Sequence, residues 1–267
     1  LKNIFMEADM KKGISIWSFP QNMSISDCIK LARHAGFDGI ELALSLEGSL
    51  SIESSDDDVI RYRALAEKEG IEISSLATDL FWSYPFTSEK SEIREKAMSI
   101  AMKQLDIAAL LGVDTILVVP GAVGVDFIPS SEIVDYDVAY ERAFKAIKEL
   151  SKYSEEKKIF LGLENVWNKF LLSPLEMKNF IDSIGSPYVG SYLDVGNVIY
   201  IGYPEQWVKI LGKRIKKVHF KDYRRDVGNS AGFVDLLSGD VNFPAVIEYL
   251  TNIGYNSYII AEMIPPS

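Results

Sequence analysis

Short apolar runs rich in β-branched residues alternate along the chain with longer stretches in which apolar residues recur at helical spacing. The short runs have the length of buried strands and the longer stretches that of amphipathic helices, so the pattern predicts parallel strands joined by crossover helices. The expected strands are residues 13–19, 39–43, 71–76, 115–119, 159–165, 189–194, 215–220 and 258–262. Eight is the number of strands that closes a barrel.

Glycine residues mark the ends of several expected helices, each just before an expected strand, where a left-handed residue commonly ends a helix. They are Gly36, Gly70, Gly112 and Gly254. No Pro/Ser-rich linker, low-complexity block or charged tail divides the chain. We therefore expect residues 1–267 to form one α/β domain, a (β/α)8 TIM barrel.

The two ends of the sequence depart from this plan. Residues 1–9 precede Met10-Lys-Lys, which resembles a natural start, and are expected to be an N-terminal extension. The chain stops a few residues past the last expected strand, so the eighth helix of the barrel is expected to be missing from this sequence. Either the sequence is truncated there, or something else covers the groove between the first and seventh helices.

Charge and composition narrow the function classes. The chain has 28 Lys+Arg and 38 Asp+Glu, a formal charge of -10, which argues against nucleic acid or another polyanion as a partner. No apolar run has the length of a membrane span, and the N-terminal residues lack the apolar core of a signal peptide. We expect a cytoplasmic protein with no membrane partner. Its single cysteine, Cys28, cannot form an internal disulfide.

Metal-binding side chains stand at the ends of four successive expected strands, the fifth to the eighth. They are Glu164, Asp194, His219 and Glu262. Because the carboxyl ends of parallel barrel strands meet at one rim, we expect these groups to converge there. Three carboxylates buried together need a cation to offset their charge. An oxygen-rich set with one imidazole suits Mn²⁺, Mg²⁺ or Co²⁺ with open positions better than a closed structural zinc site.

Such an ion would acidify a C–H group between a carbonyl and a neighbouring hydroxyl, and would stabilise the enediolate that forms when a base removes that proton.

The residues around these strand ends resemble the xylose isomerase-like TIM-barrel superfamily of sugar and sugar-phosphate isomerases and epimerases, which includes ketose 3-epimerases and hydroxypyruvate isomerase. The resemblance spans Gly13-Ile-Ser-Ile-Trp to Ala261-Glu262. Its most specific parts are Leu-Glu164-Asn, Leu-Asp194-Val-Gly-Asn, Val-His219-Phe-Lys-Asp and Ala-Glu262, followed by Gly239-Asp-Val-Asn-Phe.

The resemblance implies one catalytic divalent ion bound by Glu164, Asp194, His219 and Glu262. Manganese is the metal it favours, with Mg²⁺, Co²⁺ and Zn²⁺ as alternatives. It also implies that Glu164 and Glu262 act as an acid/base pair on opposite faces of a sugar. The family places an arginine shortly after the metal histidine, and Arg225 has the better-matching spacing, with Arg224 beside it.

Further substrate contacts are expected around the same rim. Amide, ammonium, carboxylate and aromatic side chains there suit a sugar. These candidates are Asn165, Asn197, Lys221, Trp17, Glu41 and Trp82. Lys221 is a candidate phosphate contact, and Glu41 is alternatively a structural partner of a cation at the rim.

Two positions depart from the ketose 3-epimerase pattern. Asn197 stands where those enzymes carry a substrate-binding histidine, and Phe170 stands where they carry a second glutamate. The metal set is therefore retained while the specificity set is not, and the resemblance does not name the sugar.

The sequence thus predicts a divalent-metal-dependent isomerase or epimerase of a sugar or sugar phosphate, acting through an enediolate. A metal-dependent dehydratase of a cyclic polyol or keto acid, similar to inosose dehydratase, is the main alternative. A non-catalytic sugar-binding barrel and an abasic-site endonuclease are weaker ones, since both glutamates are present and the chain has only two histidines. The expected partner is a small carbohydrate, and a homo-oligomer is compatible with the sequence.

Overall fold

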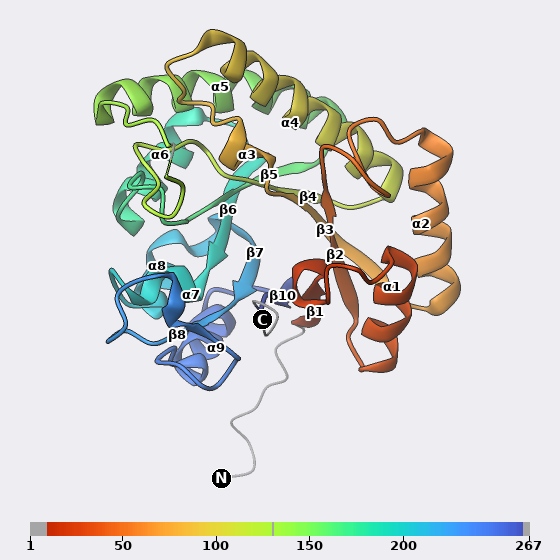
Figure 1. Cartoon of the computed structure of the whole chain (residues 1–267). Coiled ribbons are helices and arrows are strands. Elements are labelled where there is room, and N and C mark those ends of the chain that lie inside the picture. Colours follow the sequence, from red (N-terminus) through yellow and green to blue (C-terminus); the bar gives the residue numbers. More distant parts are fainter. Residues whose placement is uncertain (1–9, 130, 264–267) are drawn as a thin grey trace.

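A closed ring of parallel strands forms the centre of the computed structural model, which describes residues 10–129 and 131–263 (Figure 1). The order around the ring is β1-β10-β7-β6-β5-β4-β3-β2. The strands are β1 (Lys11–Ser15), β2 (Gly39–Leu44), β3 (Glu72–Thr78), β4 (Thr115–Val118), β5 (Phe160–Glu164), β6 (Val189–Asp194), β7 (Ile215–Phe220) and β10 (Tyr258–Ala261). The expected eight-stranded TIM barrel is therefore confirmed.

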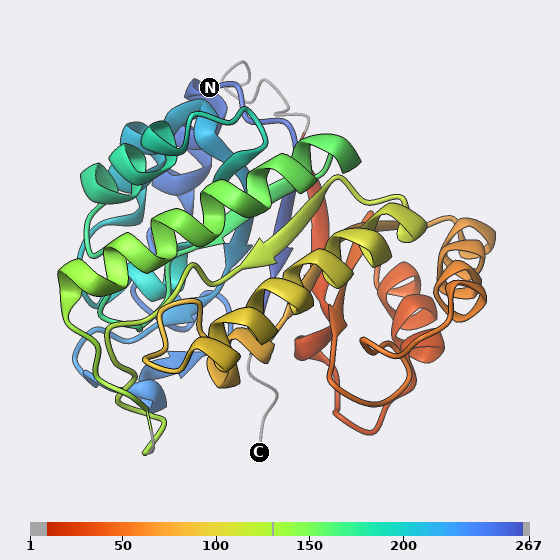
Figure 2. The same cartoon turned by 90° about the horizontal axis from the view of Figure 1, so that it is seen from above.

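Helices cover the outside of the ring, and α4 and α5 run side by side along it (Figures 1 and 2). The crossover helices are α1 (Ile25–His34), α2 (Asp56–Glu69), α4 (Ser91–Leu111), α5 (Tyr136–Lys157), α6 (Pro174–Ile184), α8 (Pro204–Leu211) and α9 (Phe243–Asn252). Within the described ranges, no helix is both long enough and apolar enough to cross a membrane.

Short elements at the carboxyl ends of the strands were not expected. They are η1 (Ile16–Ser18), α3 (Leu80–Ser83), α7 (Val195–Ile199), η3 (Ser230–Gly232), and the antiparallel pair β8 (Asp222–Tyr223) and β9 (Phe233–Val234). A further 3-10 turn, η2 (Gly212–Arg214), precedes β7. All but η2 shape the rim where the candidate chemistry lies.

The first strand is shorter than expected. It ends at Ser15, whose side chain accepts a hydrogen bond from the backbone N–H of Trp17 and caps η1. Trp17 therefore projects from a turn above the rim instead of from the strand. The expected N-terminal extension, residues 1–9, lies outside the described residues. Residues 264–267, where an eighth helix is expected to be missing, also lie outside them.

Two irregularities set the strand registers around the site. The register of β2 against β3 shifts between Ile40 and Glu41, and that of β6 against β7 shifts between Ser191 and Tyr192. An extra residue in one strand turns its following side chains to the other face of the sheet. The second shift places Asp194 directly opposite His219 on the neighbouring strand.

Candidate metal centre and active site

Four side chains from four adjacent strands converge at the carboxyl rim of the barrel. Glu164 ends β5, Asp194 ends β6, His219 is the penultimate residue of β7, and Glu262 follows β10. Each offers one ligand atom, and these atoms all lie within 4.8 Å of one another. Asp194 and His219 are fully buried, Glu164 is 7 % exposed, and the Glu262 side chain is 13 % exposed.

The backbone around Asp194 is fixed by local hydrogen bonds. Its Oδ1 accepts from the N–H of Asn197 at 2.9 Å and caps α7. The Asn165 side chain accepts from the Asp194 N–H and donates to its carbonyl, both at 2.9 Å. At Gly196, an added Cβ would lie 2.7 Å from the carbonyl oxygen of Lys221, so only glycine lets α7 pack this closely on the end of β7.

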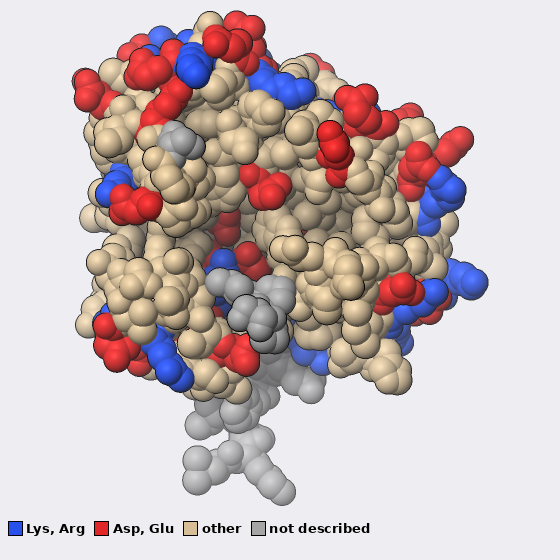
Figure 3. Space-filling view, viewed as in Figure 1, with Lys and Arg blue, Asp and Glu red and all other residues tan. Residues whose placement is uncertain are grey.

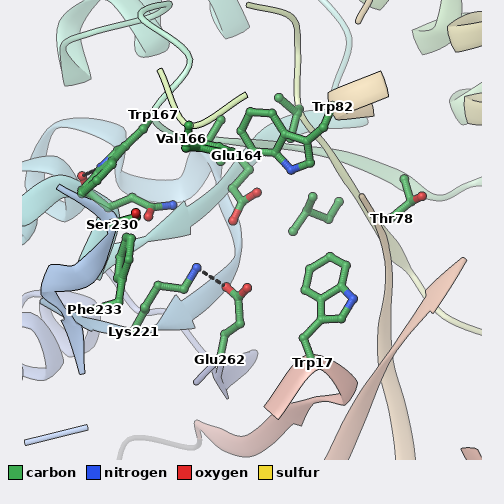
Figure 4. Close-up of a pocket in the computed structure, with 14 residues that line it drawn as sticks. Trp17, Thr78, Trp82, Glu164, Val166, Trp167, Lys221, Ser230, Phe233 and Glu262 are labelled. Atoms are coloured by element: carbon green, nitrogen blue, oxygen red, sulfur yellow. Dashed lines mark hydrogen bonds and ion pairs between the residues drawn. The ribbon is translucent and has the colours of Figure 1, made fainter. Parts of the chain in front are cut away.

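Two buried ligand oxygens have no hydrogen-bond partner, Asp194 Oδ2 and Glu262 Oε2. The ammonium of Lys221 lies 3.3 Å from the first and 2.9 Å from the second, at ion-pair distance but without hydrogen-bond geometry. Figure 4 shows the contact with Glu262. Buried carboxylate oxygens rarely go without a donor or a cation. Two buried oxygens that accept no hydrogen bond, together with the mixed carboxylate and imidazole donors, therefore fit a divalent ion.

His219 is held by carboxylates on both sides of its ring. Nδ1 faces the site, 3.3 Å from Glu164 Oε1 and 3.0 Å from Glu262 Oε2. Nε2 lies 2.9 Å from Glu41 Oε1 on the side away from the site. Burial alone would lower the pKa of His219, but the charges of Glu41 and Glu262 outweigh burial and raise that pKa well above its usual value.

The two glutamates expected to transfer protons have opposed pKa shifts. Burial, reinforced by the charges of Glu262 and Asp194, raises the pKa of Glu164 to about 7. Burial would also raise the pKa of Glu262, but Lys221 and His219 bring it below its usual range. A carboxyl group that holds a proton near neutral pH beside an ionised one is the arrangement of a general acid and a general base.

A pocket opens above these groups at the centre of the rim, with acidic and basic atoms visible at its base (Figure 3). Glu164 and Glu262 point into it from opposite sides (Figure 4). Its aromatic walls are Trp17, Trp82, Phe127, Trp167 and Phe233. Of the expected substrate contacts, Trp17, Trp82, Asn197 and Lys221 line this pocket.

Glu41 is placed differently from the expected substrate contact. Its side chain is fully buried in the barrel below the pocket, and its carboxylate accepts hydrogen bonds from Tyr192 and Ser75 as well as contacting His219. Glu41 does not line the pocket, so it is closed off from a sugar bound there. The alternative role, a structural partner of a cation at the rim, stays a prediction; the contacts that the structure gives Glu41 are with His219, Ser75 and Tyr192.

The two arginines also lie away from the pocket. The Arg225 backbone N–H donates to Asp240 at 2.8 Å, and its guanidinium lies 5.4 Å above the ring of Tyr203. Arg224 donates from Nε to the carbonyl of Ser238 at 3.2 Å. Both line a separate surface depression, and the Arg225 side chain is held there by the carbonyl of Ile199, to which its Nε donates at 3.4 Å. In this geometry, neither makes the expected contact near the candidate ligands.

Several pocket residues were not found from the sequence. Trp167 follows Glu164 by three residues, so its place just beyond a ligand strand was a usable signal. Thr78 at the end of β3 carried a weaker one. Ser230 and Phe233 carried none, because they reach the pocket only through the β8–β9 pair, which no periodicity indicates.

The fold and the site define a class: a (β/α)8 barrel with a candidate single-ion centre and two facing glutamates at its carboxyl rim. The chain belongs to the xylose isomerase-like TIM barrel family, whose model matches residues 29–267.

Two relatives and one solved structure illustrate what the chain is similar to. A putative L-ribulose-5-phosphate 3-epimerase from Haemophilus influenzae is 26% identical over 95% of this chain and 88% of its own length. A 2-epi-5-epi-valiolone 7-phosphate 2-epimerase from an Actinoplanes species is 26% identical over 82% and 74%. A crystal structure of D-psicose 3-epimerase with D-fructose covers 95% of this chain and 85% of its own, at a TM-score of 0.80 and 21% identity.

Proposed function

We propose that this protein is a divalent-metal-dependent epimerase or isomerase of a sugar or sugar phosphate. The observation that carries the proposal is the pair of carboxylates, Glu164 and Glu262, facing each other across one pocket beside Asp194 and His219. A carbohydrate between them would expose a C–H group to a carboxylate on either side.

Glu164, Asp194, His219 and Glu262 would hold the ion. Bound there, a divalent cation would polarise a carbonyl and its neighbouring hydroxyl and so acidify the C–H group between them. Manganese is the ion we propose, because hard carboxylate oxygens with one imidazole suit it and the donors leave room for substrate oxygens.

The glutamates would move the proton. One ionised carboxylate removes it from carbon, and the other, protonated, returns a proton to the opposite face, which inverts that carbon. The opposed pKa shifts of Glu164 and Glu262 support this division of roles. Epimerisation uses both faces, and the two curated relatives described above are named epimerases.

The pocket walls support a carbohydrate substrate. Trp17, Trp82 and Trp167 offer aromatic faces for sugar C–H groups, and Asn197 and Lys221 offer polar contacts for hydroxyl or phosphate oxygens. Those two relatives are named for phosphorylated substrates, which favours a sugar phosphate here. Lys221 is the pocket cation that would face such a group.

Proton exchange in D₂O tests the proposal. The protein with Mn²⁺ is incubated with a panel of ketoses, ketose phosphates and inososes, and the products are read by NMR. We expect deuterium at the carbon next to the carbonyl of at least one ketose or ketose phosphate, together with its epimer or isomer. Glu164→Gln and Glu262→Gln should each reduce the rate at least a hundredfold, within the range of general acid or base catalysis.

Two results would contradict the proposal. Undiminished exchange in both variants would remove the acid/base assignment, and full turnover after verified metal removal would remove the metal. Loss of water from an inosose without any exchange into ketoses would instead support the dehydratase.

A further inference from the structure

A buried cluster of polar side chains lies directly beneath the candidate metal ligands. Glu41 is at its centre: Oε1 is 2.9 Å from His219 Nε2, and Oε2 accepts hydrogen bonds from the hydroxyls of Ser75, at 2.9 Å, and Tyr192. These four residues come from β2, β3, β6 and β7, and each is fully buried. None of the expected proton-transfer steps uses Glu41, Ser75 or Tyr192.

The barrel backbone departs from regularity at this cluster. The β2/β3 register shift sets Glu41 opposite Ser75, whereas an unbroken register would set it opposite Ser74. On β5, Gly162 leaves room for the Tyr192 ring, since a Cβ there would lie 3.0 Å from that ring. The Tyr192 and His219 rings then pack at 4.6 Å between centroids. Bulges that aim side chains are typical of functional sites.

The contacts of Glu41 fix which nitrogen of His219 keeps its proton when the other nitrogen binds a metal. An ionised carboxylate only accepts hydrogen bonds, so Nε2 must donate to it. Nδ1 is then the nitrogen left to face Glu164 and Glu262. A histidine that binds a metal usually donates its other N–H to a carboxylate, which orients the ring and makes the ligand more basic.

We infer that Glu41 is the positioning residue of His219: held by Ser75 and Tyr192, it orients the imidazole with Nδ1 toward the metal site and supplies a buried negative charge that strengthens metal binding. This inference rests on the proposed metal site. Glu41 then increases the affinity of the site for the metal ion and does not contact the substrate.

The test compares Mn²⁺ affinity, measured by isothermal titration calorimetry, in the wild type, Glu41→Gln and Glu72→Gln. The first substitution removes the charge and keeps the shape, because Ser75 and Tyr192 hydroxyls can rotate to accept from the new amide. Glu72→Gln is the matched control, since Glu72 also accepts from a tyrosine hydroxyl, that of Tyr258, but lies outside the site. We expect Glu41→Gln to bind Mn²⁺ about 10- to 100-fold more weakly and the control to match wild type.

NMR supplies a second readout that does not depend on activity. The sequence has two histidines, and His34 is exposed on α1, so the imidazole of His219 can be assigned in ¹⁵N-labelled protein. With diamagnetic Mg²⁺ present, we expect an exchange-protected Nε2 proton far downfield in wild type. In Glu41→Gln it should move upfield and exchange faster, because its acceptor is no longer charged.

Each outcome decides a separate point. A twofold or smaller change in affinity with an unmoved Nε2 proton would overturn the inference, whereas failure of wild type to bind any divalent ion would overturn the proposed function. If circular dichroism shows that Glu41→Gln does not fold, Tyr192→Phe replaces it, since it loosens Glu41 and retains the charge. That variant should bind Mn²⁺ at least threefold more weakly, and wild-type affinity would refute the positioning role.

Discussion

Replacing Lys221 by methionine should tighten the binding of a divalent ion to the protein in the absence of substrate. The Lys221 ammonium lies 2.9 Å from Glu262 Oε2 and 3.3 Å from Asp194 Oδ2, two oxygens of the candidate ligands. The ammonium and a metal ion would therefore compete for the same pair of carboxylates. Methionine keeps much of the length and apolar packing of the lysine stem and removes only the charge.

The distances set the size of this effect. An ion about 2.1 Å from Glu262 Oε2 lies at most about 5 Å from the ammonium in its present position. At an effective dielectric constant of about 20, charges of +2 and +1 at that separation repel by about 7 kcal/mol, and withdrawal of the ammonium to about 8 Å leaves about 4 kcal/mol. If screening leaves only a third of that value, about 1.4 kcal/mol, the Kd falls tenfold.

Calorimetric titration with Mn²⁺ measures this change directly. We expect Lys221→Met to lower the Kd at least tenfold. Lys169→Met is the matched control, because the ion pair between Lys169 and Asp126 lies on the surface. The Kd of this variant for Mn²⁺ should equal that of wild type. An unchanged or weaker Kd in Lys221→Met would refute the argument that the ammonium and the ion share one pair of carboxylates.

Saturation with Mn²⁺ at about 100 times its Kd should stabilise the fold by about 2.7 kcal/mol, which calorimetry should show as a rise in Tm of about 5 to 10 °C. The same rise in Asp194→Asn would contradict the ligand assignment. Gly196→Ala should cost about 1 to 3 kcal/mol in urea denaturation, because the new Cβ would meet the Lys221 carbonyl at 2.7 Å, while Gly202→Ala, whose nearest contact is 3.5 Å, should cost less. Mn²⁺ affinity should rise as the pH passes through about 7, because burial raises the pKa of Glu164 to about 7 and its proton must leave before a metal binds. Equal Mn²⁺ affinities below and above this pH would contradict the assignment of Glu164 as a ligand.

The sequence identified those parts of the molecule that local pattern determines. Strands buried on both faces read as continuous apolar runs, so all eight could be found, and Val189–Asp194 and Ile215–Phe220 have the expected bounds. The convergence of Glu164, Asp194, His219 and Glu262 could also be predicted, because the end of a parallel barrel strand has only one rim to face.

Other features depend on geometry that no local pattern encodes. The burial of Glu41 depends on a register shift between β2 and β3, and it sits three residues before the end of its strand, deeper than the candidate ligands. Arg224 and Arg225 follow His219 closely in sequence, but the β8–β9 loop determines where their side chains point. Loop conformation depends on tertiary contacts, so proximity in sequence to a ligand did not place them in the pocket.

The most direct test of the metal centre is an anomalous diffraction experiment on crystals of the protein grown with Mn²⁺. The account predicts one strong anomalous peak at the carboxyl rim of the barrel, in contact with Glu164, Asp194, His219 and Glu262 and with the Lys221 ammonium moved away from it. An empty rim at saturating Mn²⁺, with Lys221 still paired to Asp194 and Glu262, would contradict it.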